Sequence, residues 1–359
     1  MEPSTRVIAE AGVNHNGDIA LAERLVAEAV SAGADIVKFQ TFRAADLATA
    51  AAATSAYQRR NTGEVVAQTE MLRRLELSDD AHRHLARQCE ASGIEFLSTP
   101  FDLRSAEFLV SDIGIRRIKV SSGDLTNGPF LLALARLGLP MILSTGMATL
   151  GEVEEAVGVF AFARVAGADA TPSRTAFSEA LGSPEGRAAV AESLTLLHCT
   201  TEYPASFASV NLRAMDSLAV FSTPIGLSDH TEGWTVPIAA VARGATVVEK
   251  HFTLDRTLTG PDHRASLEPG ELKAMVDALR IVEVALGSRV KAPHPSERPN
   301  MAVARKSLVA RRPIAAGEPF DAANLGAKRP GTGLSPMAWW SMLGRPANRP
   351  YAADEIIDS

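Results

Sequence analysis

Two histidines in the second half of the chain each close a short apolar run and follow a polar residue by two positions. They are His230, preceded by Ser228, and His251, preceded by Glu249. If both runs are β-strands, residues two apart point to the same side of a strand, so all four side chains face one space. Two imidazoles at adjacent strand ends can bind one transition-metal ion, with water or carboxylate oxygens completing its shell. The pattern predicts a metal site; the alternative is two buried histidines bonded to backbone.

Lysines and hydroxyls at the ends of other apolar runs indicate an anion site. Ammonium and hydroxyl groups that converge can bind a phosphate and a carboxylate. The lysines could instead pair with Glu10 or Glu249. The chain has no Walker loop, and no G-x-G-x-x-G follows a strand, so a nucleotide is not the expected anion. The candidate anion-binding residues are Lys38, Gln40, Thr99, Lys119, Ser122, Ser144 and Ser228.

Two carboxylates form a third group of candidates. Glu10 ends the first apolar run, and Asp262 lies in the loop GPDH near residue 260. Either could bind the hydroxyls of a polyol or act as an acid or base. The plainer alternative for Glu10 is a salt bridge to a lysine of the sheet.

These residues require a scaffold that brings strand ends together. Eight β-branched runs alternate with helical patterns, such as those over 19–32 and 79–92, which predicts a closed (β/α)8 TIM barrel. Polar residues gather at the C-terminal ends of the runs, where the active sites of this fold lie, so the pattern favours an enzyme. The eight runs end at Glu10, Gln40, Thr99, Ser122, Thr145, Cys199, His230 and Phe252.

Three stretches interrupt or follow the barrel pattern. Residues 44–77 form an insertion long enough to be a lid or a partner-contacting segment. Residues 167–192 form a second insertion, in which one short helix is expected. A segment rich in proline and charge predicts a linker over 288–300, between a catalytic barrel over 1–287 and a small, mostly β domain over 301–359. A domain that small is expected to lean on the barrel or on a partner subunit.

Composition excludes several classes of protein. The 359 residues carry a formal net charge of −6, which disfavours nucleic acid and anionic membranes as partners. Two cysteines make no disulfide framework, and the N-terminus lacks the pattern of a signal peptide. Charged residues interrupt the longest apolar stretches, so no membrane span is expected and the protein is expected to be cytoplasmic.

Eight motifs occur in the order found in the sialic acid synthase (N-acetylneuraminate synthase) family. They are IAEAGVNHNGD, ADIVKFQTF, KVSSGD, ILSTGM, LHCT with a following YP, GLSDHT, VEKHFT and GPDH, and the tail with KRPGTG resembles that family's antifreeze-protein-like (SAF) domain. The resemblance implies an enzyme that condenses phosphoenolpyruvate with an open-chain N-acylated hexosamine. N-acetylmannosamine would give N-acetylneuraminate, and phosphate would leave by cleavage of the C–O bond.

The resemblance also implies roles for individual residues. A divalent metal, Mn²⁺ with Mg²⁺ or Co²⁺ as alternatives, would be held by His230 and His251 and would polarise the sugar aldehyde. The candidate anion-binding residues would hold phosphoenolpyruvate, and Glu10, Tyr203 and Asp262 would contact the sugar. Arg329 would enter the active site of the neighbouring subunit, which implies a homodimer whose C-terminal lid is swapped between subunits.

Three positions depart from the pattern of the best-known bacterial members. Thr201 stands where an asparagine contacts phosphoenolpyruvate, Asp124 where a glutamate follows SG, and Val303 where an aromatic residue lines the sugar pocket. A smaller residue at 303 could admit the 2,4-diacetamido-2,4,6-trideoxymannose that is used for N,N'-diacetyllegionaminate. Two other hypotheses stay open: a Schiff-base aldolase that uses Lys38 or Lys119, and a non-catalytic carbohydrate-binding protein.

Overall fold

The larger part of the chain forms a parallel barrel. The computed structural model describes residues 5–49, 51–63 and 66–358, and the chain divides into two compact units, Met1–Gly287 and Ser288–Ser359. Unit 1 contains one sheet in the order β3-β2-β1-β8-β7-β6-β5-β4. Among the described residues no hydrogen-bonded ladder joins β3 to β4, although the two strands pack together. The strands are β1 (Arg6–Gly12), β2 (Ile36–Thr41), β3 (Glu95–Pro100), β4 (Ile118–Val120), β5 (Met141–Ser144), β6 (Leu194–Cys199), β7 (Ile225–Asp229) and β8 (Val247–His251).

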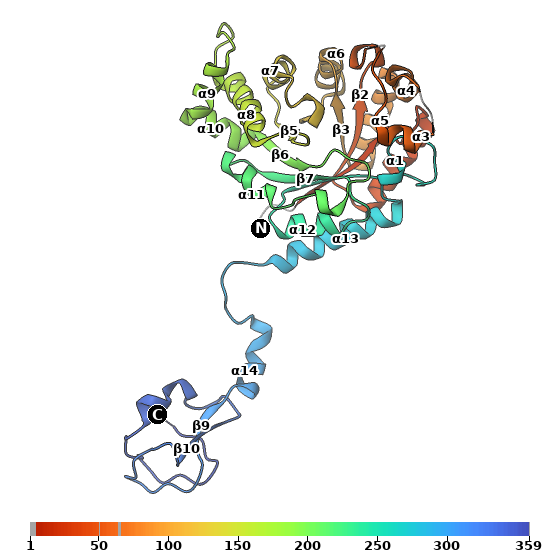
Figure 1. Ribbon diagram of the computed structural model, residues 1–359. Coiled ribbons are helices and arrows are strands. Elements are labelled where there is room, and N and C mark those ends of the chain that lie inside the picture. The colour runs from red at the N-terminus through yellow and green to blue at the C-terminus, as the bar shows by residue number, and fades with distance from the viewer. Residues whose placement is uncertain (1–4, 50, 64–65, 359) are drawn as a thin grey trace. The chain divides into compact units, whose positions relative to one another are not determined.

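Helices surround this sheet, as Figure 1 shows, so the predicted (β/α)8 architecture is confirmed. Helix α1 begins after Asp18, whose side chain accepts a hydrogen bond from the Ala20 amide, and ends at Gly33 with φ 78°. Both α1 and α5 have the limits that the sequence predicted. The outer helices include α1 (Ile19–Ala32), α5 (Asp79–Ser92), α6 (Leu103–Phe108), α7 (Gly128–Arg136), α8 (Leu150–Val165), α11 (Ala214–Leu218), α12 (Thr235–Ala242) and α13 (Pro269–Leu286).

A layer of aliphatic side chains fills the inside of the barrel. Side chains two apart on a strand share a face, so the residue two positions after each of these aliphatic residues also points inward. Ile8 is thus followed by Glu10, and Ile36 by Lys38. The apolar layer therefore lies directly below the polar residues at the C-terminal ends of the strands. It consists of Ile8, Ile36, Leu97, Ile142, Leu197 and Val247.

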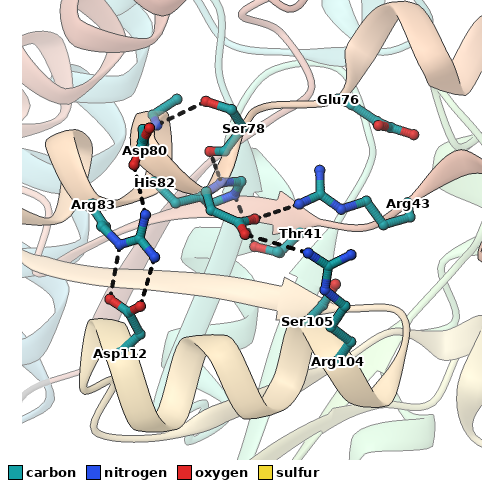
Figure 2. Close-up of polar contacts among 12 residues, drawn as sticks. Thr41, Arg43, Glu76, Ser78, Asp80, His82, Arg83, Arg104, Ser105 and Asp112 are labelled. Atoms are coloured by element: carbon teal, nitrogen blue, oxygen red, sulfur yellow. Dashed lines mark hydrogen bonds and ion pairs between the residues drawn. The ribbon is translucent and has the colours of Figure 1, made fainter.

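The described residues of the insertion over 44–77 form three helices, and the insertion is closed at its base. They are α2 (Ala44–Leu47), α3 (Ala56–Thr62) and α4 (Gln68–Leu75). The Ala44 amide donates a hydrogen bond to the Glu76 carboxylate, and Arg43 lies 2.5 Å from Asp79. Figure 2 shows this region together with the start of α5. The two ends of the insertion therefore leave and rejoin the barrel at one place.

The start of α5 is itself held by polar contacts, which Figure 2 also shows. Ser78 caps the helix by accepting from the Ala81 amide, and Arg83 lies 2.7 Å from both Asp80 and Asp112. The second of these ion pairs joins α5 to the turn after α6. These contacts keep the point of attachment of the 44–77 insertion fixed.

The second insertion holds two helices, α9 (Arg174–Gly182) and α10 (Pro184–Ser193), and not the single helix that was expected over 167–192. The prediction missed the second helix because only a few residues mark the start of each helix. Ser173 caps α9, and Ser183 caps α10 just ahead of Pro184, which is favoured in a first helical turn.

Unit 2 has a small core of its own. Strands β9 (Ser307–Ala310) and β10 (Leu325–Lys328) pair antiparallel. The stretch expected as a linker over 288–300 is partly helical: a 3-10 turn covers Pro295–Glu297, and α14 (Arg298–Ala304) crosses the expected boundary at residue 300. No helix among the described residues is long and apolar enough to cross a membrane. The core of unit 2 includes Leu308, Ile314, Phe320, Leu325, Tyr351 and Ile357.

Candidate active site

A pocket of about 330 Å³ lies at the C-terminal ends of the strands. Thirteen of the fifteen residues that the sequence singled out line it, so one cavity collects the metal, anion and sugar candidates. These thirteen are Glu10, Lys38, Gln40, Thr99, Lys119, Ser122, Ser144, Thr201, Tyr203, Ser228, His230, His251 and Asp262.

Two buried lysines and two buried carboxylates form the floor of the pocket. The Lys38 ammonium lies 2.8 Å from Glu10 and 3.6 Å from Glu249, and the Lys119 ammonium lies 3.4 Å from Glu249. The Ser228 hydroxyl donates to Glu249 at 2.7 Å. The alternative pairing of the lysines with these carboxylates is thus present, and it keeps the two ammonium groups together inside the pocket.

Glu249 is a site residue that the sequence did not identify as one. The sequence predicted only that Glu249 faces the same space as His251 and that it could pair with a lysine. The signal was available, because a carboxylate two positions before His251 must point into the same space as that imidazole. Its central place between Lys38 and Lys119 required the three-dimensional register of β2, β4 and β8.

The two carboxylates differ in their pKa. Burial raises the pKa of Glu10 to about 7, even though Lys38 acts in the opposite direction. Burial would also raise the pKa of Glu249, but Lys119 and Lys38 lower it to about 2. Environments that separate the pKa values of two nearby carboxylates assign them different roles. Glu10 can exchange a proton near neutral pH, whereas Glu249 stays ionised.

Hydroxyl groups hold the two lysines in place. Lys38 donates to the Thr99 hydroxyl at 3.1 Å, and Lys119 donates to the Ser144 hydroxyl at 2.8 Å. The Ser122 hydroxyl accepts from the Gly146 amide at 2.9 Å. An anion that enters the pocket meets two ammonium groups and several hydroxyl groups that line one cavity.

The two histidines lie beside each other at the ends of β7 and β8. Their ring centroids are 5.4 Å apart, and the His230 Nδ1–H group donates to the Thr200 carbonyl at 2.8 Å. This bond selects the tautomer whose Nε2 lone pair is free to bind a metal. His251 Nδ1 is buried and has no hydrogen-bond partner among the described residues.

This pair fits a divalent cation with open coordination positions. Over the described part of the chain no group of three or more His, Cys, Asp and Glu side chains is arranged to hold a metal. The protein would therefore supply two imidazoles and leave the other positions to water and substrate oxygens. Catalytic metal sites keep positions open in this way, whereas structural sites are closed by protein ligands.

The part of the pocket around Asp262 and Tyr203 carries a buried carboxyl group and stacked aromatic rings. Burial raises the pKa of Asp262 to about 6. The Tyr203 ring lies 4.1 Å from the His230 ring and stacks on Tyr57 at 4.9 Å. Tyr57 belongs to α3 of the insertion, and sequence patterns gave no signal for it because an isolated tyrosine in a helix is not distinctive.

Two of the fifteen predicted residues lie outside this lining. Asp124 sits in the 3-10 turn Ser122–Asp124, where its side chain accepts from Asn127 at 3.2 Å. Arg329 belongs to unit 2, is exposed, and donates to the Ala304 carbonyl at 3.1 Å. Val303 of the same unit is 68% exposed.

Comparison with known proteins agrees with this geometry. The NeuB family model matches residues 25–291, and the SAF domain model matches residues 305–358. The chain belongs to the NeuB family. This NeuB-family chain is 44% identical, over 98% of both chains, to the N,N'-diacetyllegionaminic acid synthase of Campylobacter jejuni. It is 43% identical to the enzyme of the same name in Legionella pneumophila, with coverage of 94% of this chain and 89% of that one.

Two further relatives are named as synthases of sialic acids or their phosphates. The human N-acetylneuraminate-9-phosphate synthase is 35% identical and aligns with 87% of this chain and 79% of its own length. The crystal structure of a sialic acid synthetase from Leptospira borgpetersenii, in complex with citrate, matches with a TM-score of 0.66 and 32% identity, over 83% of this chain and 90% of that one. The NeuB-family chain is therefore an enzyme of the sialic and legionaminic acid synthases.

Proposed function

We propose that this enzyme condenses phosphoenolpyruvate with 2,4-diacetamido-2,4,6-trideoxymannose, giving N,N'-diacetyllegionaminate and phosphate. The observation that carries the proposal is the convergence of two lysines, several hydroxyls and two histidines on one pocket. Two relatives with more than 40% identity, both named N,N'-diacetyllegionaminic acid synthases, favour this sugar. N-acetylmannosamine, the sugar first expected from the motifs, is the second candidate, and the likeness to the Leptospira synthetase supports it.

The lysine cluster would bind phosphoenolpyruvate. Lys38 and Lys119, with the hydroxyls of Thr99, Ser144 and Ser228, would hold its phosphate and carboxylate groups. Glu249, whose pKa the two lysines lower to about 2, favours the charged form of both ammonium groups, while burial lowers the pKa of Lys119. The candidate roles of Gln40, Ser122 and Thr201, as further donors to this substrate, belong to the same proposal.

The reaction would then form one carbon–carbon bond and break one carbon–oxygen bond. The methylene carbon of phosphoenolpyruvate attacks the aldehyde carbon of the sugar, and water adds to the carbon that bears the phosphate. The resulting tetrahedral carbon releases phosphate with the bridging oxygen. Glu10, whose pKa lies at about 7, would give a proton to the aldehyde oxygen, while Asp262 and Tyr203 hold the sugar.

His230 and His251 would hold a divalent cation, Mn²⁺ or alternatively Mg²⁺ or Co²⁺. When bound, such an ion supplies Lewis-acid polarisation of the sugar aldehyde. Removing metal with a chelator is expected to abolish phosphate release, and added Mn²⁺ is expected to restore it. Full turnover by metal-free protein would contradict this part of the proposal.

The small domain would complete the site of a partner subunit. Residues 288–359 carry eleven Lys and Arg against six Asp and Glu, whereas residues 1–287 carry 25 against 36, so the small domain is attracted to a barrel surface. Arg329 is exposed and could enter the partner's pocket in a swapped homodimer.

Mixing two inactive variants tests the swap. In a swapped dimer of His251→Ala and Arg329→Ala subunits, one barrel is intact and receives an intact arginine. A one-to-one mixture is therefore expected to regain about a quarter of wild-type turnover after subunit exchange. No recovery in a mixture that forms heterodimers would exclude delivery of Arg329 across the dimer.

Product analysis tests the central proposal. The full chain, with Mn²⁺ and phosphoenolpyruvate labelled with ¹⁸O at the bridging oxygen, is offered each of the two sugars. We expect labelled phosphate and a product mass equal to diacetyllegionaminate. Unlabelled phosphate would contradict C–O cleavage, and a substrate adduct trapped by borohydride would support the aldolase hypothesis instead. Sugar binding without turnover would support a carbohydrate-binding protein.

A further inference from the structure

One face of α4 lines the pocket opposite the polar strand ends. Gln68, Met71, Leu72 and Leu75 follow the i, i+3, i+4, i+7 spacing of a single helix face, and all four line the pocket. The three apolar members are 7%, 8% and 7% exposed, in that order along the chain. The insertion therefore gives the cavity an apolar wall with one amide at its edge.

The position of this wall is fixed by contacts to the barrel. Met71, Leu72 and Leu75 form one buried cluster with Val13, Phe42 and Ala44. The backbone at the start of α4 is also anchored, since the Gln68 amide N–H donates to the Ala52 carbonyl at 3.0 Å. The wall is thus a rigid part of the site.

Gln68 differs from the other polar residues of the insertion that reach the pocket. The Gln58 side-chain oxygen accepts from the Ser55 backbone as part of a capping box, and Tyr57 stacks on Tyr203. The Gln68 side-chain amide has no hydrogen-bond partner among the described residues. It therefore has both a donor and an acceptor available for a ligand.

A side-chain amide next to apolar side chains is complementary to an acetamido group, which combines a polar amide with an apolar methyl group. The amide of Gln68 can donate to the acetamido carbonyl or accept from its N–H group, while the acetyl methyl packs against Leu72 and Met71. A hydroxyl group in the same place would leave the apolar surface uncovered. The wall is therefore suited to an acylated amino sugar more than to a fully hydroxylated one.

The chemistry of the two candidate sugars indicates which acetamido group matters for selection. The cluster of the wall lies against the ends of β1, β2 and β3, through Val13, Phe42 and the partly buried Phe101. Both candidate sugars carry an acetamido group at C2, whereas only one of them carries an acetamido group at C4. A wall that distinguishes the two sugars must therefore contact the group at C4.

We infer that Gln68 and Leu72 select the sugar by binding its C4 acetamido group. This inference rests on the proposed function and deepens it, because neither residue belongs to the set that holds phosphoenolpyruvate or metal. Gln68 would act as a specificity-determining residue through its amide, and Leu72 through the methyl contact.

The test compares two acceptors that differ only at C4. One is 2,4-diacetamido-2,4,6-trideoxymannose, and the other is 2-acetamido-2,6-dideoxymannose, which has a hydroxyl at C4. Wild-type enzyme is expected to prefer the first by about tenfold or more in kcat/KM. Gln68→Ala and Leu72→Ala are each expected to lower kcat/KM for the first sugar by about tenfold and to leave the second within about twofold.

Matched variants separate specificity from folding. Thr69→Ala changes the next residue of α4, which does not line the pocket, and is expected to keep the wild-type preference. Gln68→Asn retains a shorter amide and is expected to give an intermediate preference. The KM for phosphoenolpyruvate is expected to stay the same in all four variants, because the lysine cluster is untouched.

The outcomes distinguish the inference from the proposed function. If wild-type enzyme turns over the diacetamido sugar and Gln68→Ala keeps the preference, the inference is wrong and the function stands. If both acceptors react equally well with wild-type enzyme, α4 does not distinguish an acetamido group from a hydroxyl at C4, and the inference is again overturned. If no sugar yields phosphate from phosphoenolpyruvate, the proposed function and the inference fall together.

Discussion

The Lys250 ammonium lies 2.6 Å from the Asp229 carboxylate, and both side chains are buried. The two residues are paired in the register of β7 and β8, and each directly precedes one of the two histidines. Because successive side chains on a strand alternate, this ion pair lies on the opposite side of the strands from the imidazoles. It therefore ties the two strands together just where the spacing of His230 and His251 is set.

Breaking this ion pair is expected to destabilise the barrel. Lys250→Met leaves the Asp229 carboxylate buried without its partner, which typically costs about 3–5 kcal/mol of the free energy of unfolding. Urea denaturation measures the loss. In the double variant Lys250→Met with Asp229→Asn, the loss in the free energy of unfolding should be smaller than the sum of the losses in the two single variants, because no unpaired charge remains. Additive losses would contradict direct coupling of the pair.

Removing one imidazole is expected to abolish metal binding without unfolding the chain. His251→Ala should weaken Mn²⁺ binding by at least about a hundredfold and eliminate phosphate release. Calorimetric titration with Mn²⁺ measures the affinity, and circular dichroism checks the fold. His84→Ala is the control, since His84 is exposed and pairs with Glu23 on the outside of the barrel. Unchanged Mn²⁺ affinity in His251→Ala would exclude this residue as a ligand.

The lysine cluster is expected to determine the affinity for phosphoenolpyruvate. Lys119→Met removes a buried cation that faces Glu249 and Ser144. Loss of a buried charge partner typically weakens binding of an anion by about 3 kcal/mol, which corresponds to a rise of about a hundredfold in the KM for phosphoenolpyruvate. Steady-state kinetics at saturating sugar measure it. Lys273→Met, which alters an exposed lysine paired with Asp277, should behave like wild type. Equal KM values in the two variants would remove Lys119 from the anion site.

Two neutral histidines are expected to make the barrel sensitive to acid. Burial lowers the pKa of His15 and of His263 to about 4, whereas the unfolded chain titrates near 6.5. Between these values the unfolded state binds protons that the folded state does not. Stability should therefore fall as the pH drops from about 6.5 to 4, by up to roughly 3 kcal/mol for each histidine.

Urea denaturation at pH 7, 6 and 5 measures this dependence. His263→Gln should reduce its slope, because one of the two groups no longer takes up a proton on unfolding. His84→Gln, which changes an exposed histidine, should keep the wild-type slope. An unchanged slope in His263→Gln would mean that His263 is not the source of the acid sensitivity.

The barrel is expected to fold without the small domain but not to turn over substrate. A chain that ends at Ala292 keeps unit 1 and its core but loses Arg329. Thermal unfolding monitored by circular dichroism should remain cooperative, while phosphate release should be lost. Arg329→Ala in the full chain should reproduce the loss. Full turnover by the shortened chain would exclude a catalytic contribution from the small domain.

The barrel and most of the pocket were predictable because both follow from local rules. Strand ends, alternation of side chains and the preference of active sites for one rim placed Lys38, Lys119 and the two histidines in one cavity. The sequence predicted that Glu249 faces the same space as His251 but gave it no role in the site, and it gave no signal for Gln68. Their roles depend on which strands and helices face each other across the pocket, and that information lies in contacts between residues far apart in the sequence. The second helix of the 167–192 insertion was missed because short helices depend on caps more than on periodicity.

The closed base of the 44–77 insertion has a consequence for how this family could diversify. Because the Ala44 amide is hydrogen-bonded to Glu76, the segment leaves and rejoins the barrel at one place. The segment can therefore be replaced as a unit while the barrel stays unchanged. The residues proposed to hold phosphoenolpyruvate and metal lie outside this segment, whereas the α4 wall lies inside it. Under the proposed roles, acceptor choice can change through this segment without any change to the residues of the bond-forming chemistry.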